Sequence, residues 1–240
     1  MKANRLIRPL LLSTFLISCQ SAIINTSKDV PFEGINESLN LYAFVGEKIS
    51  VIEFDPNEKQ DKNQKSEKIA DEETGDSVTV IKEKYVMDNA FRCKYKVISK
   101  ILNDTKTDTI EFLAYDHYGS PRFAEKDTVI LYLLKNKDDG HFFHHKYQFD
   151  NVFKDKDGNY FSYPKFISSE DQTDGIDVLK GFAAHLKNER FNVSHLNDDS
   201  RQRYYPKLFY KIENHIAIPI KGIYLSELIN YRLKTTFKDL

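Results

Sequence analysis

The segment from Asp88 to Lys135 constrains the fold most, because its side-chain pattern is that of consecutive β-strands. Apolar and basic residues alternate over 91–97, which is typical of a strand with one buried and one solvated face. A polar turn at 103–106 separates this strand from a second one at 107–115. The apolar run at 129–134 is too short for a helix and contains β-branched and aromatic residues, so it predicts a strand that is buried on both faces.

Further strands are predicted on both sides of this segment. Residues 39–54 alternate in polarity and are interrupted at Gly46, which predicts one long strand with a bend or bulge at the glycine. The pair Asp139-Gly140 favours a hairpin turn, and residues 141–149 then form the return strand.

The segment 55–77 is predicted to be a mobile loop. Twelve of its 23 residues are charged, and Ile69 is its one large apolar residue. Such a segment buries too little apolar surface to offset the entropy that ordering costs.

The C-terminal part changes its periodicity. Apolar residues at helical spacing predict a helix over 176–186, and those at 224–233 predict a last helix. Residues 188–205 are polar and are predicted to be loop, whereas 208–220 favour an extended conformation. The predicted fold class is therefore α+β: mainly antiparallel β, with an OB-like Greek-key barrel and C-terminal helices.

The N-terminus has the features of an export signal. Lys2, Arg5 and Arg8 precede a short apolar stretch at 10–17, which is too short to span a bilayer. The residues Leu16-Ile17-Ser18-Cys19 resemble a bacterial lipobox. An ordinary secretory signal with a cysteine there by chance is the alternative.

The lipobox resemblance implies cleavage before Cys19 and acylation of its thiol and its new amino group, which would anchor the protein to a membrane. Gln20 in place of Asp implies the outer membrane. About twenty flexible residues after Cys19 would give the tether a reach of roughly 25 Å. The predicted organisation is a lipoprotein signal peptide at 1–18, a tether at 19–38, an OB-like β domain at 39–164 and an α-containing C-terminal segment at 165–240.

Charge and cysteine content narrow the set of partners. Removal of three of the 35 basic residues with the signal peptide leaves 32 against 36 acidic ones, a net charge of −4. There is no basic excess of the kind that nucleic-acid binding requires. If Cys19 carries lipid, Cys93 has no disulfide partner within the chain, and its place on an apolar strand face predicts a small buried hydrophobe.

Residues 39–135 are similar in strand spacing to the netrin-like and metalloproteinase-inhibitor type of OB-fold domain. The resemblance rests on the long first strand, the strand–turn–strand unit at 91–115 and the apolar strand that follows a polar turn. It implies a five-stranded barrel and a binding role. The paired cysteines of that family are absent, and the N-terminal Cys19 is expected to carry lipid, so no inhibitory residue is carried over.

The histidines of the segment 141–145 are the candidate metal ligands. His141 and His145 would share one face of a strand and His144 would point to the other, so two ligands could converge where zinc needs three or four. We therefore predict no metal site and no cofactor. The stretch 155–158 resembles part of a calcium loop, but the required first and twelfth ligand positions are Phe153 and Pro164, which favours a hairpin turn.

No catalytic motif stands out from the sequence. It contains no G-x-S-x-G nucleophile motif, P-loop or dinucleotide fingerprint. The many Tyr and Phe residues of 141–163 would either fill the barrel and its contact with the C-terminal helices or form an exposed surface for sugars or a partner.

We expect a membrane-anchored envelope lipoprotein that acts as a binding module, in the manner of an inhibitor or an immunity protein, with an envelope protein as its partner. The alternative is a surface or periplasmic hydrolase or carbohydrate-binding lipoprotein that uses the aromatic and histidine residues of 141–163. A third hypothesis is a structural envelope lipoprotein without a tight soluble ligand.

Overall fold

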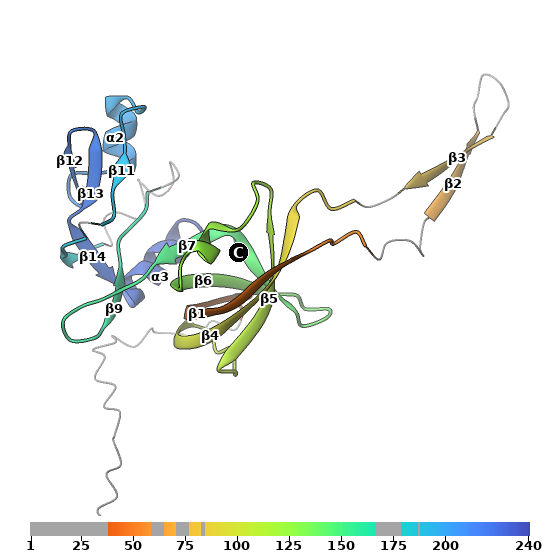
Figure 1. The fold of residues 1–240 in the computed structure, drawn as a ribbon, viewed down its shortest axis with the longest axis horizontal. Helices are drawn as coiled ribbons and strands as arrows, with labels where there is room; N and C mark the ends of the chain where they lie inside the picture. The colour runs from red at the N-terminus through yellow and green to blue at the C-terminus, as the bar shows by residue number, and fades with distance from the viewer. Residues whose placement is uncertain (1–37, 59–64, 71–76, 83–84, 167–178, 187) are drawn as a thin grey trace, which may run out of the picture.

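The structure of the chain is a computed structural model. It describes residues 38–58, 65–70, 77–82, 85–166, 179–186 and 188–240 (Figure 1). The predicted signal peptide, Cys19 and nearly all of the predicted tether lie outside these residues, so lipidation stays a prediction.

Five strands close into a barrel (Figure 1). Around the barrel the order is β1-β4-β5-β7-β6, and every pairing is antiparallel except that of β5 with β7. This Greek-key arrangement confirms the predicted OB-like barrel. The strands are β1 (Leu41–Phe54), β4 (Asn89–Leu102), β5 (Thr109–Asp116), β6 (Thr128–Lys135) and β7 (Phe142–Asn151).

The long first strand bends where the sequence predicts it. The register between β1 and β4 shifts between Val45 and Gly46, and again between Lys48 and Ser50. A side chain at Gly46 would lie 2.9 Å from the ring of Phe44, so the glycine lets the strand pass close to its neighbours. The bulges allow one strand to pair with β6 over its first half and with β4 over most of its length.

Side chains of all five strands fill the barrel interior. Phe123, from the 3₁₀ helix η2 (Arg122–Glu125), packs between the rings of Tyr95 and Phe112. The buried interior residues include Phe44, Phe91, Cys93, Ile110, Ala114, Val129, Leu131 and Leu133.

The prediction of a mobile loop over 55–77 is wrong in part. Residues 65–70 form β2 (Lys65–Ala70), which pairs along its whole length with β3 (Ser77–Lys82). The hairpin projects away from the barrel (Figure 1). Its second strand is rich in the β-branched residues that favour strands, and backbone pairing with it orders the polar first strand.

The described residues after the barrel form several small sheets and two helices, and the first two short strands of these sheets, at 153–162, precede the predicted boundary at 165. A four-stranded sheet has the order β10-β14-β9-β8, and a three-stranded sheet has the order β11-β13-β12. The elements are β8 (Phe153–Lys154), β9 (Tyr160–Ser162), β10 (Phe182–Ala183), β11 (Phe191–Asn192), α2 (Asp198–Tyr204), β12 (Tyr210–Glu213), β13 (Ile216–Pro219), β14 (Lys221–Tyr224) and α3 (Leu225–Lys234).

The structure confirms three predictions in this part of the chain: the turn at 155–158, the extended segment 208–220 and the last helix. The predicted helix over 176–186 is wrong where the structure describes it. Residues 179–186 contain strand β10 and no helix. Gly181 has φ +61°, outside helical geometry, and its N–H donates a 3.0 Å hydrogen bond to Glu227. The predicted loop over 188–205 also contains β11 and α2, which Asn197 caps by accepting a hydrogen bond from the N–H of Ser200.

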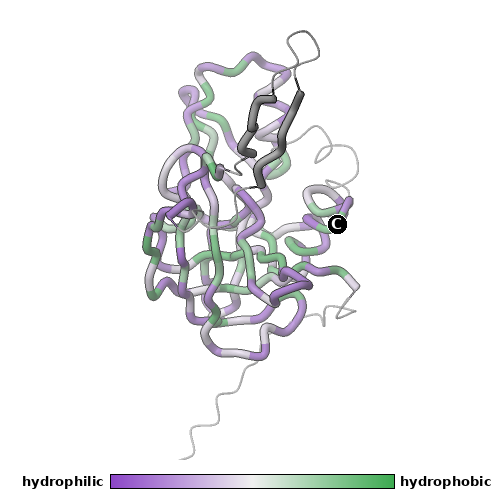
Figure 2. Tube along the Cα trace, turned by 90° about the vertical axis from the view of Figure 1, so that its right-hand side faces the viewer, coloured by the Kyte–Doolittle hydropathy of each residue, from purple (hydrophilic) through white to green (hydrophobic). Residues whose placement is uncertain are grey.

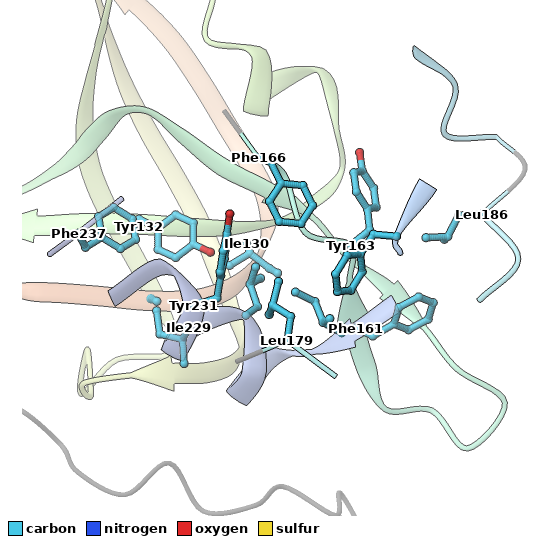
Figure 3. Close-up of a cluster of buried hydrophobic side chains, with 14 of the residues drawn as sticks. Ile130, Tyr132, Phe161, Tyr163, Phe166, Leu179, Leu186, Ile229, Tyr231 and Phe237 are labelled. Carbon is cyan, nitrogen blue, oxygen red and sulfur yellow. The ribbon is translucent and has the colours of Figure 1, made fainter. Parts of the chain in front are cut away.

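A second hydrophobic cluster joins the C-terminal segment to the barrel (Figure 3). Ile130 and Tyr132 of β6 belong to it, whereas Val129 and Leu131 of the same strand face the barrel interior. The strand is therefore buried on both faces, as predicted. Hydrophobic residues lie mainly along the strands, and many of the connecting loops are hydrophilic (Figure 2).

Candidate functional site

A groove of about 530 Å³ crosses the outer face of the barrel. It lies over the ends of β1, β4 and β5 and reaches the start of β7. Its lining residues include Ser50, Ile52, Phe54, Pro56, Arg92, Lys94, Glu111, Leu113, Tyr115, His141 and Phe142.

The strand register sets the pattern of side chains in the groove. Ile52, Arg92 and Leu113 are paired across three strands, and they form one row. Ser50 and Glu111 flank Lys94 in the next row. Because these side chains point away from the barrel interior, they do not contribute to its core and are available to a ligand.

The two cations of the groove are held differently. Nζ of Lys94 lies 2.8 Å from Oε1 of Glu111, and this hydrogen bond lowers the pKa of the glutamate. The guanidinium carbon of Arg92 lies 4.2 Å from the centroid of the Phe54 ring. The structure shows no carboxylate paired with Arg92 among the residues that it describes.

The candidate histidines do not come together. His141 lines the groove beside Phe142, whereas His145 packs against Phe237, with 5.2 Å between the ring centroids. His144 is half-buried, and its ring centroid lies 4.5 Å from that of Phe123 in the barrel. Within the described residues, no group of three or more His, Cys, Asp and Glu side chains could hold a metal ion.

Some aromatic residues of 141–163 fill the interior and others lie at the surface. Phe161 and Tyr163 are buried in the second hydrophobic cluster, as core residues would be. Phe142 lines the groove, and Tyr147 is 47% exposed. Neither alternative therefore holds for all of these residues.

The base of the inserted hairpin borders the groove. Asn57 holds the two arms of the insertion together, because its side chain both donates to the carbonyl and accepts from the N–H of Val86, each at 3.0 Å. Tyr85 and Met87 beside it are 71% and 79% exposed. Phe54 and Pro56 line both this hollow and the groove, so the two surfaces are continuous.

A bulge in β7 forms a separate surface feature. Between His144 and Phe149 this strand has three more residues than the facing part of β6. Tyr147 lies in the bulge with φ +66°, and its ring is 6.0 Å from that of Tyr118. Lys146 anchors the bulge through a 2.7 Å contact with Asp88.

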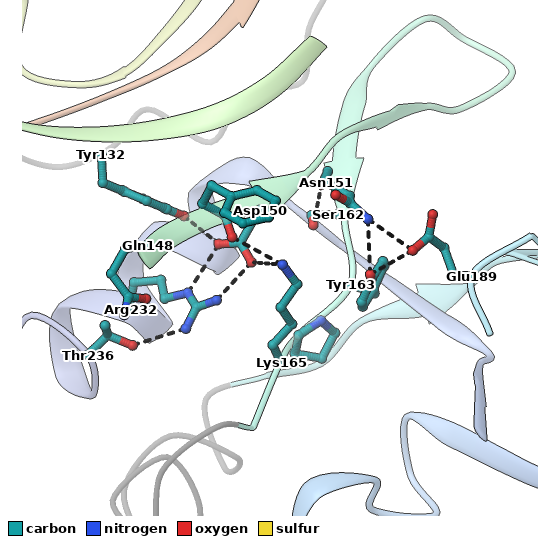
Figure 4. A network of polar contacts seen from close by, with 12 residues as sticks. Tyr132, Gln148, Asp150, Asn151, Ser162, Tyr163, Lys165, Glu189, Arg232 and Thr236 are labelled. Atoms are coloured by element: carbon teal, nitrogen blue, oxygen red, sulfur yellow. Dashed lines mark hydrogen bonds and ion pairs between the residues drawn. The ribbon is translucent and has the colours of Figure 1, made fainter. Parts of the chain in front are cut away.

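A buried polar network lies between the barrel and the C-terminal segment (Figure 4). Asp150 of β7 accepts a hydrogen bond from the hydroxyl of Tyr132 and two from the guanidinium of Arg232. Lys165 lies 3.5 Å from the same carboxylate and donates to the carbonyl of Phe149. Burial opposes ionisation of Asp150, but the charges of Arg232 and Lys165 keep its pKa below the usual value.

A cavity of about 370 Å³ adjoins this network in the C-terminal segment. Phe166, Phe191 and Tyr205 line it together with Lys165. The amino group of Lys165 is directed to Asp150 (Figure 4). The cavity therefore offers mainly apolar and aromatic surface, whereas the groove combines aromatic rings with a free cation, so we place the candidate site in the groove.

Among the groove residues, His141 stands out in the sequence as a candidate ligand, whereas Arg92 and Phe54 do not. Both residues lie in segments whose alternating polarity predicts strands. Their contact depends on the register between β1 and β4. Gly46 marks one shift in that register, but no local pattern marks the shift between Lys48 and Ser50.

No protein-family model matches the chain, and comparison with curated proteins and with solved structures finds no match. No helix in the described part of the chain is long and apolar enough to cross a membrane.

Proposed function

We propose that this protein is a lipid-anchored lipoprotein of the bacterial outer membrane that acts as a binding module for an envelope protein. The single observation that carries the binding role is the groove on the outer face of the barrel, with its exposed apolar, aromatic and charged side chains. The lipobox at Cys19 supports the anchor.

The groove has the location and chemistry of a binding surface. OB-like barrels use this outer face, between the loops that follow their first and fourth strands, to bind oligonucleotides and oligosaccharides. In this chain the corresponding connections are the hairpin insertion after β1 and the turn at 136–141 after β6. The analogy is one of fold alone, and the residues of the groove have to supply the specificity.

The anchor is tested with the full-length chain. Cys19→Ser is expected to move the protein from the membrane fraction to the soluble periplasmic fraction and to abolish incorporation of labelled palmitate. Cys93→Ala is the matched control and should stay in the membrane. Membrane attachment of Cys19→Ser that survives high salt would contradict the proposed anchor.

The binding role is tested by capture from an envelope extract on immobilised Ser38–Leu240. One envelope protein should be recovered near stoichiometric amount. Ile52→Trp fills the groove without adding charge and should abolish that recovery. Ile212→Trp is the matched control, because Ile212 is also exposed but lies on β12 of the C-terminal segment. Equal recovery by both variants would place the binding surface outside the groove.

A carbohydrate-binding role is the second candidate, favoured by the rings of Phe54, Tyr115 and Phe142 in the groove. Sugar rings stack on exposed aromatic faces. Retention of Ser38–Leu240 on purified envelope polysaccharide, lost in Ile52→Trp, would favour this role over protein binding.

A further inference from the structure

The groove has one cation more than it has anions. Arg92 and Lys94 are its two basic residues, and Glu111 is its one carboxylate. Since Glu111 is paired with Lys94, the charge of Arg92 is left uncompensated. The carboxylates of Glu53, Asp55 and Asp88 line the adjoining hollow and not the groove, and Asp88 is paired with Lys146.

Arg92 also has an aromatic neighbour. Its guanidinium carbon lies over the ring of Phe54, 4.2 Å from the centroid, and the structure shows no hydrogen bond from its N–H groups to another side chain among the residues that it describes. Those N–H groups match the two oxygens of a carboxylate. In the same row, Ile52 and Leu113 on either side offer apolar contact to whatever carries the anion.

The spacing of the rows fits an extended chain. Arg92 and Lys94 are two residues apart on β4, which corresponds to about 7 Å along a strand. Side chains at alternate positions of an extended peptide have the same spacing. A peptide that runs along β4 can therefore present one side chain to Arg92 and the next on that face to the Lys94–Glu111 pair.

Resting on the proposed binding function, we infer that the groove binds an acidic, extended segment of the partner protein, with a carboxylate paired to Arg92 and an apolar side chain packed beside Ile52 and Leu113. A nucleic acid does not fit as well, because Glu111 would face its phosphates and a single free cation would neutralise few of them.

The test uses defined probes and Ser38–Leu240. The probes are a short fluorescein-labelled peptide with the repeat Glu-Ser-Leu-Ser, which places Glu and Leu on the same face of an extended chain, its counterpart with Gln in place of Glu, and an oligo-dT strand. Fluorescence anisotropy should show binding of the Glu peptide that weakens with added salt. The Gln peptide and oligo-dT should bind about tenfold more weakly or not at all, since a charge-assisted hydrogen bond is lost.

The variants assign the effect to Arg92. Arg92→Glu should lower the affinity for the Glu peptide at least about tenfold, and Arg92→Lys should retain part of it because the charge stays while the planar fork is lost. Arg190→Glu makes the same charge change at an exposed site of the C-terminal segment and should have little effect.

The inference is overturned if the Glu and Gln peptides bind alike, if neither binds, if oligo-dT binds best, or if Arg92→Glu binds like the unmodified chain. Capture of the envelope partner by Arg92→Glu is measured in parallel. If Arg92→Glu still captures the envelope partner as well as the unmodified chain does, whereas Ile52→Trp no longer captures it, the proposed function stands and the acidic-segment inference is overturned.

Discussion

Arg232 of the last helix and Asp150 of the last barrel strand form a buried ion pair, in which Nη2 lies 2.7 Å from Oδ1 and Nε lies 3.2 Å from Oδ2. Their side chains are 1% and 0% exposed. The pair connects the barrel to the C-terminal segment and, with Tyr132, satisfies both oxygens of the carboxylate. Removal of Arg232 would leave the fully buried carboxylate with the more distant Lys165 as its cation, and removal of Asp150 would leave the buried guanidinium without its carboxylate.

Arg232→Leu should therefore destabilise the protein by about 3–5 kcal/mol. Urea denaturation of Ser38–Leu240 measures the change. Lys94→Leu breaks an exposed pair and should cost less than about 1 kcal/mol. The double variant Asp150→Asn/Arg232→Leu should recover part of the loss, because the buried carboxylate no longer lacks its guanidinium and the cation left at this site, Lys165, is 21% exposed. A loss of less than about 1 kcal/mol in Arg232→Leu would contradict this account.

His144 should make stability depend on pH. Burial lowers its pKa from 6.5 to about 4, although its hydrogen bond with the carbonyl of Gln148 acts in the opposite direction. The unfolded chain takes up the proton first, so the free energy of unfolding should fall as the pH drops from 6.5 towards 4, by on the order of 3 kcal/mol. His145 should add to this trend, because burial lowers its pKa as well.

Urea titrations between pH 7 and pH 4 would measure this dependence. His144→Leu should flatten the curve in that range, whereas His195→Gln, at an exposed position, should leave its slope unchanged. The same slope in His144→Leu as in the unmodified chain would assign the pH dependence to other groups.

The thiol of Cys93 should not react in the folded protein. It is 2% exposed in the barrel interior, and burial raises its pKa to about 12. In Ser38–Leu240 at pH 8, Ellman's reagent should therefore react with Cys93 only when the chain unfolds. Ser120→Cys in a Cys93→Ala background supplies an exposed control thiol that should react at once. Equally fast reaction of both thiols would mean that the barrel is open in solution.

Gly222→Ala should destabilise the contact of β14 with its neighbours. The added carbon would lie 2.7 Å from the ring of Phe161 and 2.9 Å from that of Phe182. Overpacking of this kind costs about 1–3 kcal/mol. Phe182→Leu should relieve part of the loss when it is combined with Gly222→Ala. If Phe182→Leu adds a further loss of stability to that of Gly222→Ala, the close contact with the Phe182 ring does not cause the loss in Gly222→Ala.

The barrel could be predicted from the sequence, because each of its strands has a period-two pattern or an unbroken apolar run. The prediction of a helix over 176–186 is wrong for a specific reason. Leu179, Phe182 and Leu186 have helical spacing, but Phe182 pairs with Gly222 and Gly181 has positive φ. Long-range pairing therefore overrode the local pattern.

The groove and the buried ion pair could not be derived from the sequence. Arg232 follows Leu228 and Ile229 on the apolar side of the last helix, and a charge there was a visible sign of a buried partner. The sequence did not identify Asp150 as that partner, since 82 positions separate the two residues. The contact of Arg92 with Phe54 depended in the same way on register.

That separation also bears on how the protein is made. A chain is synthesised from its N-terminus, so β7 is made well before the helix that carries Arg232. Until those last residues are made, Asp150 lacks the guanidinium of Arg232, and Ile130 and Tyr132 lack the C-terminal residues that cover them. A prematurely terminated chain would display both defects, and proteases could distinguish it from the finished protein by its exposed apolar surface.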